Sequence, residues 1–170
     1  SGEDEPARSA STAEGTTAKL EVFVSIPPQK FFAERVGGDR VQVSVLVPQG
    51  QSPHSYAPTP KQVLALGRAD ILFTIGVDFE RAFIPEIRSG LPELTIADSR
   101  QGIQLRRMDT HSHDEEEHDE SDHPETDVDP HVWLGPAQAK TIAANMRDAL
   151  IELDSAHSAA YQRNYRQLEA

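Results

Sequence analysis

The sequence predicts an α/β fold in which a parallel four-stranded sheet is flanked by helices. Between residues 20 and 97, short runs rich in Val, Ile and Phe alternate with segments of helical spacing. This alternation is typical of strands joined by helical crossovers, which makes the strands parallel and the crossovers right-handed. Residues 70–75 are almost entirely apolar, as expected for a strand buried on both faces.

Local signals delimit each of these elements. Pro27-Pro28 stops the first strand, and Gly37-Gly38 ends the helix that follows it. Residues 41–47 alternate between apolar and polar side chains, which indicates a second strand. We expect strands at residues 20–25, 41–47, 70–75 and 94–97, and helices at residues 29–36, 61–68 and within 76–90.

The last part of the chain is predicted to be helical. Gly135-Pro136 is a suitable helix start, because proline is favoured at the first helical position. One apolar stripe follows, formed by Ala139, Ile142, Ala143, Met146, Ala149, Leu150 and Leu153. Asp154-Ser155 is expected to cap a second helix with Tyr161, Tyr165 and Leu168 on one face.

Two segments do not fit the repeat of strand and helix. Residues 1–18 are rich in Ser, Thr, Ala, Glu and Gly without apolar periodicity, so we expect a disordered leader or tether. Such a tether commonly joins an exported domain to a lipid anchor, and a leader added for expression explains it equally well. Residues 101–128 are too long and polar for an ordinary connection and predict a mobile loop rich in His and acidic residues.

Charge and composition exclude several classes of protein. The formal net charge is −12, but residues 109–129 hold eleven acidic and no basic residues, which leaves 17 acidic and 16 basic residues elsewhere. No basic stripe exists to neutralise phosphates, so a nucleic-acid partner is not expected. The chain has no cysteine, which excludes disulfides and thiolate metal sites. No apolar run is long enough to span a bilayer.

Two histidines are candidate metal ligands. His54 follows the second predicted strand, and His131 follows the fourth within the proline-stiffened segment 129–136. Ligands in open α/β sheets bind outside the carboxyl ends of the strands, where both histidines could meet. Asp129 is available to orient His131. The alternative is that His131 is a buried histidine without a ligand role.

The acidic segment contains four more histidines, which are His111, His113, His118 and His123. Imidazoles mixed with carboxylates on a flexible chain attract borderline divalent ions such as zinc, with low affinity because each ligand must first be ordered. The alternative is a solvated acidic loop that only increases solubility. Asp78 and Glu80, after the third predicted strand, are further candidate ligands at the same edge.

No local motif of a known catalytic site is present. His113 and His118 are five positions apart instead of four, so they do not form the His-Glu-x-x-His helix of zinc proteases. The sequence also lacks a glycine-rich phosphate loop, a nucleophile elbow and a calcium-binding loop.

Several motifs resemble the ZnuA-like solute-binding proteins, the zinc and manganese receptors of ABC transporters. These motifs are, in chain order, residues 24–28, 36–41, 53–60, 69–70, 129–134 and 152–154, with Tyr161 and Asn164. The two most specific are Pro53-His54-Ser55-Tyr56-Ala57-Pro58-Thr59-Pro60 and Asp129-Pro130-His131-Val132-Trp133-Leu134. A histidine-rich acidic loop before the second motif is typical of the zinc-transporting members.

The resemblance implies two α/β lobes joined by a long helix, with the metal between them. Residues 19–154 would form the N-terminal lobe and residues 155–170 the start of the connecting helix. His54 and His131 would be this lobe's ligands, and the remaining ligands would lie outside this sequence. The cargo would be Zn²⁺ rather than Mn²⁺, and the partner an ABC transporter permease.

The resemblance further implies a binding protein and not an enzyme. It would be a monomer, located in the periplasm or anchored outside the cytoplasmic membrane, with no membrane span of its own. Two alternatives remain open from the sequence: a zinc-dependent hydrolase, in which an open position on the metal would hold water, and a manganese-binding or adhesin lipoprotein of the same fold.

Overall fold

The parallel sheet predicted from the sequence is present in the computed structural model, which describes residues 18–103 and 135–170. Its strand order is β2-β1-β3-β4, and all neighbouring strands are parallel. The strands are β1 (Leu20–Val24), β2 (Val41–Val45), β3 (Ile71–Thr74) and β4 (Thr95–Asp98). The central strand β1 pairs with β2 from Leu20↔Val41 to Val24↔Val45.

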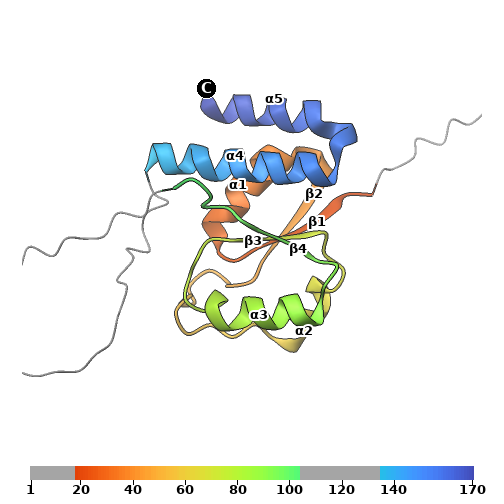
Figure 1. The fold of residues 1–170 in the computed structure, drawn as a ribbon. Coiled ribbons are helices and arrows are strands. Elements are labelled where there is room, and N and C mark those ends of the chain that lie inside the picture. Colours follow the sequence, from red (N-terminus) through yellow and green to blue (C-terminus); the bar gives the residue numbers. More distant parts are fainter. Residues whose placement is uncertain (1–17, 104–134) are drawn as a thin grey trace, which may run out of the picture.

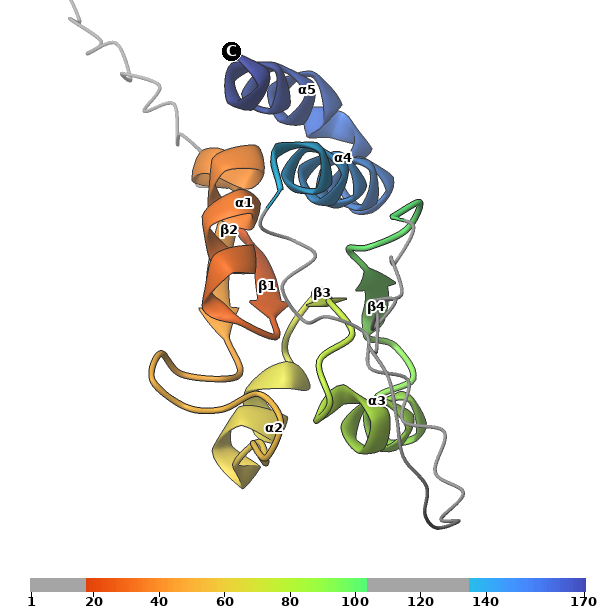
Figure 2. The same ribbon diagram turned by 90° about the vertical axis from the view of Figure 1, so that its left-hand side faces the viewer.

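Helices cover both faces of this sheet (Figures 1 and 2). The helical elements are α1 (Pro27–Gly37), η1 (Gly38–Arg40), α2 (Pro60–Leu66), α3 (Glu80–Gly90), α4 (Pro136–Leu153), η3 (Ser155–His157) and α5 (Ser158–Glu169). α1 and α4 lie on one face, and α2 and α3 lie on the other. α5 packs against both α1 and α4 as an additional outer helix. None of the helices in the described part of the chain is long and apolar enough to cross a membrane.

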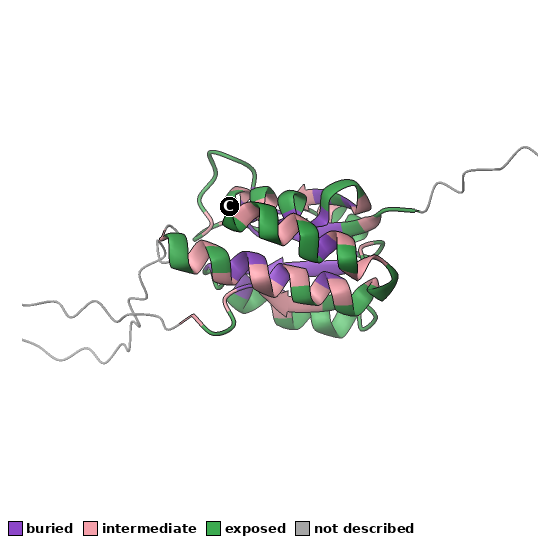
Figure 3. Ribbon diagram, turned by 90° about the horizontal axis from the view of Figure 1, so that it is seen from above, coloured by how far each residue is buried: buried purple, intermediate pink, exposed green. Residues whose placement is uncertain are grey.

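Apolar burial holds these layers together. The residues of β3 are all buried, which confirms the prediction of a strand covered on both faces. The predicted stripe on α4 is also confirmed, since Ile142, Ala143, Met146 and Leu150 are buried while Leu153 is more exposed. Figure 3, seen from the side of α5, shows buried stretches along α4 and largely exposed residues on α5.

A polar contact fixes α5 against the end of α1. The Asn164 side chain donates to the Val36 carbonyl at 3.0 Å, at the end of α1. Gly38 has φ 54°, and a Cβ there would lie 2.9 Å from Asn164 Nδ2, so glycine suits both the backbone and the close approach. Tyr161, a residue of α5, is fully buried. α5 is therefore packed against the rest of the described structure.

The expected capping role of Asp154-Ser155 is wrong in detail. A 3-10 turn at Ser155–His157 precedes α5, and the residue before α5 is His157, whose side chain makes no capping hydrogen bond. The Asp154 side chain instead accepts from His157 Nδ1 at 2.8 Å and from the Tyr161 hydroxyl at 2.6 Å. Arg40 lies 3.7 Å from the same carboxylate. Asp154 thus connects the α4–α5 junction to the turn before β2.

The charge on Asp154 should stabilise the fold. Burial alone would raise the pKa of this carboxyl, but the hydrogen bonds from His157 and Tyr161 and the nearby positive charges outweigh it and lower the pKa. A lowered pKa stabilises the folded state above the unfolded pKa of about 3.9, and this contribution is lost as the pH falls through the folded value.

We therefore expect Asp154→Asn to lower the free energy of unfolding at pH 7 by about 1–2 kcal/mol, because the amide keeps one acceptor but loses the charge. Urea denaturation at a series of pH values measures this difference, which should shrink as the pH falls below about 4. Asp148→Asn is the control, since Asp148 is an exposed residue of α4 paired only with its neighbour Arg147 among the described residues. Equal stability of the two variants at pH 7 would contradict this role of Asp154.

Candidate functional site

The loops after the parallel strands meet at one edge of the sheet. In the order β2-β1-β3-β4 the chain moves from β1 to β2 on one side and then crosses to β3 on the other. The topological switch point therefore lies between β1 and β3, where ligands bind in open α/β sheets. His54 lies in the loop after β2, and Asp78 and Glu80 follow β3.

A buried network of hydrogen bonds joins the two loops at the switch point. The Glu80 carboxylate accepts from the Ser25 hydroxyl at 2.5 Å, from Ile75 N at 2.9 Å and from Gly76 N at 2.7 Å. Glu80 is only 6% exposed. Burial raises the pKa of this carboxyl, and the hydrogen bonds and the charge of Arg100 oppose that rise. The sequence predicted Glu80 as a candidate ligand. Because its carboxylate oxygens are already hydrogen-bonded inside the fold, Glu80 is a structural residue here.

Gln29 extends this network across the sheet. Its side chain is fully buried, and its Oε1 accepts from the backbone N–H of Ser25 at 3.0 Å and of Ile26 at 3.1 Å. Its Nε2 donates to the carbonyls of Phe73 and Thr74, at 3.2 Å each, and to the Ser99 hydroxyl at 3.0 Å. One amide thus connects the ends of β1, β3 and β4. The sequence alone did not indicate this role of Gln29, although its position directly after Pro27-Pro28 was visible.

His54 itself is exposed at this edge. The exposed fraction of its side chain is 63%, and its Nδ1 pairs with Asp78 Oδ2. The backbone N–H of His54 donates to the Ser52 hydroxyl at 3.3 Å. Asp78 thus lies beside His54 at the same edge of the sheet, and the two side chains bind each other.

The His54 loop is held against its neighbours on both sides. Phe79 N donates to the Pro53 carbonyl at 3.3 Å, and the Tyr56 ring meets the Phe79 ring edge-on with centroids 6.0 Å apart. Tyr56 donates its hydroxyl to Gln62 Oε1 at 2.7 Å, and Gln62 Nε2 donates to the Leu46 carbonyl at 2.6 Å. The loop therefore presents His54 from a supported backbone.

The other predicted ligands lie outside the described residues. These are His131, its expected partner Asp129, and the acidic segment's His111, His113, His118 and His123. Within residues 18–103 and 135–170, no group of three or more His, Asp or Glu side chains is placed to hold a metal ion. Of the two main predicted ligands, His54 and His131, the described part of the chain therefore contains only His54.

The beginning of α4 lies at the same end of the sheet. In Figure 1 the chain enters β1 on the right, whereas the loop after β2 and the first turn of α4 both lie on the left. The Asn145 side chain donates to the carbonyls of Ser99 at 2.8 Å and Gln101 at 2.9 Å, which fixes α4 beside the end of β4. The described structure therefore resumes, at the start of α4, at the end of the sheet where the His54 loop lies.

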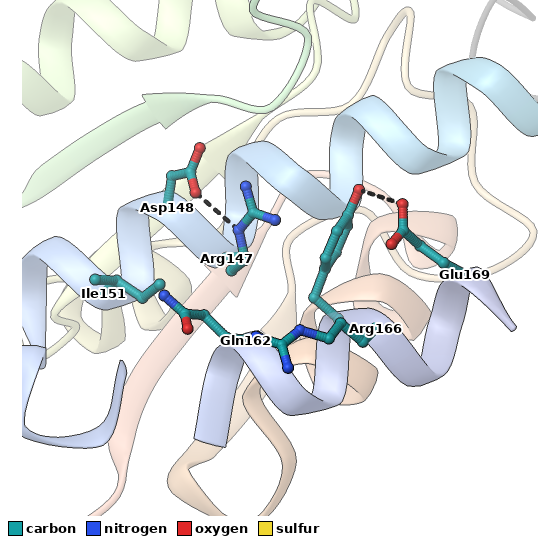
Figure 4. Close-up of a pocket in the computed structure, with 7 residues that line it drawn as sticks. Arg147, Asp148, Ile151, Gln162, Arg166 and Glu169 are labelled. Atoms are coloured by element: carbon teal, nitrogen blue, oxygen red, sulfur yellow. Dashed lines mark hydrogen bonds and ion pairs between the residues drawn. The ribbon is translucent and has the colours of Figure 1, made fainter. Parts of the chain in front are cut away.

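A concave feature of about 390 Å³ lies between α4 and α5 (Figure 4). Its charged and aromatic side chains largely satisfy one another. Arg147 Nε donates to Asp148 at 2.8 Å and its guanidinium lies 4.3 Å from the Tyr165 ring centroid, while the Tyr165 hydroxyl donates to Glu169 at 3.2 Å. Neither His54 nor Asp78 lines it, so it is separate from the candidate metal site.

Comparison with known proteins identifies similar chains. The family model described as "Zinc-uptake complex component A periplasmic" (ZnuA) matches residues 22–170. The high-affinity zinc uptake system protein ZnuA of Bacillus subtilis is 31% identical over 155 residues, which cover 90% of this chain and 48% of that protein. The protein of the same name from Yersinia pestis is 30% identical, covering 89% of this chain and 52% of its own length.

Solved structures and other relatives agree with this match. A ZnuA crystal structure is 34% identical, with a TM-score of 0.73, and covers 88% of this chain and 53% of the solved chain. A manganese ABC transporter substrate-binding lipoprotein of Streptococcus gordonii is 24% identical, covering 91% of this chain and 48% of that protein. The chain thus spans about half the length of the relatives it matches.

We expect Gln29→Ala to lower the free energy of unfolding by about 2–5 kcal/mol, because it leaves buried N–H groups at the end of β1 without their acceptor. Urea denaturation measures the change. Gln42→Ala, at an exposed position of β2, is the matched control and should change stability by less than about 0.5 kcal/mol. If the two variants are equally stable, Gln29 does not hold the switch point together.

Proposed function

Because the chain belongs to the ZnuA family of periplasmic zinc-uptake components, we propose that it is the N-terminal lobe of a zinc receptor that delivers Zn²⁺ to an ABC transporter permease. Residues 19–154 form this lobe, residues 155–170 begin the connecting helix, and residues 1–18 are a tether. The observation that carries the proposal is the position of His54, exposed on a supported loop at the carboxyl edge of the sheet.

The proposed site combines His54 with His131. A tetrahedral zinc site takes imidazole nitrogens at about 2.0–2.1 Å. The two histidines supply half of such a site, and further ligands from a second lobe complete it. Asp129 orients His131, and the histidines of residues 101–128 collect zinc with low affinity near the cleft. Each of these roles extends the sequence prediction to residues outside the described structure.

Zinc is favoured over manganese by the pattern of relatives. The two relatives named as zinc uptake proteins are 31% and 30% identical to this chain. The relatives named for manganese and for iron are 24% and 25% identical. A ZnuA deletion mutant solved with zinc bound is 34% identical. Imidazole ligands suit zinc, whereas manganese prefers carboxylate, carbonyl and water oxygens.

The proposal places the protein outside the cytoplasmic membrane as a binding protein. The matching family is described as periplasmic, and several relatives are named as lipoproteins. Relatives with a named role are uptake or binding proteins, which supports a receptor rather than a hydrolase. The receptor acts as a monomer, and a lipid anchor would hold it near its permease.

Isothermal titration of zinc into the full-length protein tests the proposal. We expect His54→Ala and His131→Ala each to weaken binding by more than the ~10–100-fold typical of losing a residue that only orients a ligand. Gln49→Ala, exposed in the same loop as His54, is the control and should bind as the unmodified protein does.

Unchanged zinc affinity in both histidine variants would show that the proposed site is wrong. Ester or phosphate hydrolysis by the zinc-loaded protein, lost in the same variants, would instead favour a hydrolase. Tighter binding of manganese than of zinc would reassign the cargo.

A further inference from the structure

The His54 imidazole is held through one of its two ring nitrogens. Nδ1 pairs with Asp78 Oδ2, and Nε2 has no hydrogen-bond partner among residues 18–103 and 135–170. The two residues are 24 positions apart and come from the loops after β2 and β3. Their contact therefore spans the switch point of the sheet.

We propose that Asp78 is the positioning residue of the metal site: it fixes the tautomer and the direction of the His54 ring so that Nε2 is the atom that binds zinc. This inference rests on the proposed function, because it assigns a role relative to the zinc that His54 would bind. It also replaces the earlier prediction of Asp78 as a direct ligand.

Proton accounting supports this assignment. An ionised carboxylate only accepts hydrogen bonds, so Nδ1 must carry the proton that it shares with Asp78. A neutral imidazole has a single N–H, and the lone pair is then on Nε2. The ligand atom is therefore prepared before the metal arrives. The same geometry argues against direct coordination by Asp78, since the carboxylate lies at Nδ1 while a metal on Nε2 would lie on the other side of the ring.

Asp78 can perform this role because the two residues that follow it are held in place. Its second neighbour Glu80 is buried and binds Ser25, Ile75 and Gly76. Its first neighbour Phe79 donates to the carbonyl of Pro53, the residue that precedes His54. Two adjacent contacts thus connect the loops: the backbone hydrogen bond from Phe79 to Pro53 and the side-chain pair of Asp78 and His54.

Nitrogen NMR of the His54 ring in the metal-free full-length protein tests the tautomer directly. At a pH where the ring is neutral, we expect the proton on Nδ1 in the unmodified protein and a shift towards Nε2 in Asp78→Ala. Asp78→Asn should retain the original tautomer, because its amide oxygen still accepts from Nδ1. Asp39→Ala, at an exposed position of η1, is the matched control and should leave the spectrum of His54 unchanged.

Zinc titration of the same variants gives the second readout. We expect Asp78→Ala to weaken zinc binding by about 10–100-fold, Asp78→Asn to weaken it less, and Asp39→Ala to leave it unchanged. His54→Ala should cause a larger loss than Asp78→Ala. This order distinguishes an orienting residue from a ligand.

The outcomes separate this inference from the proposed function. If His54→Ala leaves zinc affinity unchanged, the proposed site fails whatever the tautomer. If His54→Ala abolishes binding but Asp78→Ala changes neither the tautomer nor the affinity, the positioning role is wrong and the site stands. If Asp78→Ala reduces affinity as much as His54→Ala and X-ray absorption shows one fewer oxygen ligand on zinc, Asp78 is a ligand and the inference is overturned.

Discussion

The burial of Glu80 at the switch point is the constraint on which the rest of the site depends. A buried carboxylate is costly unless every oxygen is hydrogen-bonded. Glu80 satisfies this demand with donors from the two loops that follow β1 and β3, namely Ser25 after β1 and Ile75 and Gly76 after β3. The hydrogen bonds that satisfy this carboxylate therefore hold the two loops in fixed relative positions. This arrangement sets the position of His54 and leaves it exposed.

The same network explains why α3 begins only at Glu80. A helix was predicted within residues 76–90, and α3 occupies Glu80–Gly90 of that range. Gly76 has φ 83°, a conformation that glycine adopts without strain, and its N–H is turned towards Glu80. Residues 76–79 are therefore a loop that carries Asp78 to His54. Apolar periodicity could not show this, because the deciding contact is a side-chain carboxylate binding backbone N–H groups four and five residues earlier.

The fold was predictable because its signals are local. Alternating strands and helices, the proline stops and the apolar stripe of α4 all arise from neighbouring residues, and the observed elements agree with them within a few positions. The polar contacts that build the site are different. Gln29 binds Ser99 from 70 positions away, and His54 binds Asp78 from 24. Pairings at such separations leave no periodic trace in one sequence, so His54 and Asp78 were predicted at one edge without their mutual contact.

The exposure of His54 fits a site that is shared between two bodies. A ligand that completed its coordination within one lobe would be covered by that lobe, whereas the side chains of His54 and Asp78 are 63% and 51% exposed. The loops that carry these two side chains are supported by buried groups, namely the amide of Gln29 and the carboxylate of Glu80. In the proposed site, this rigid base under an exposed His54 would let a metal bind with little reorganisation of the described structure.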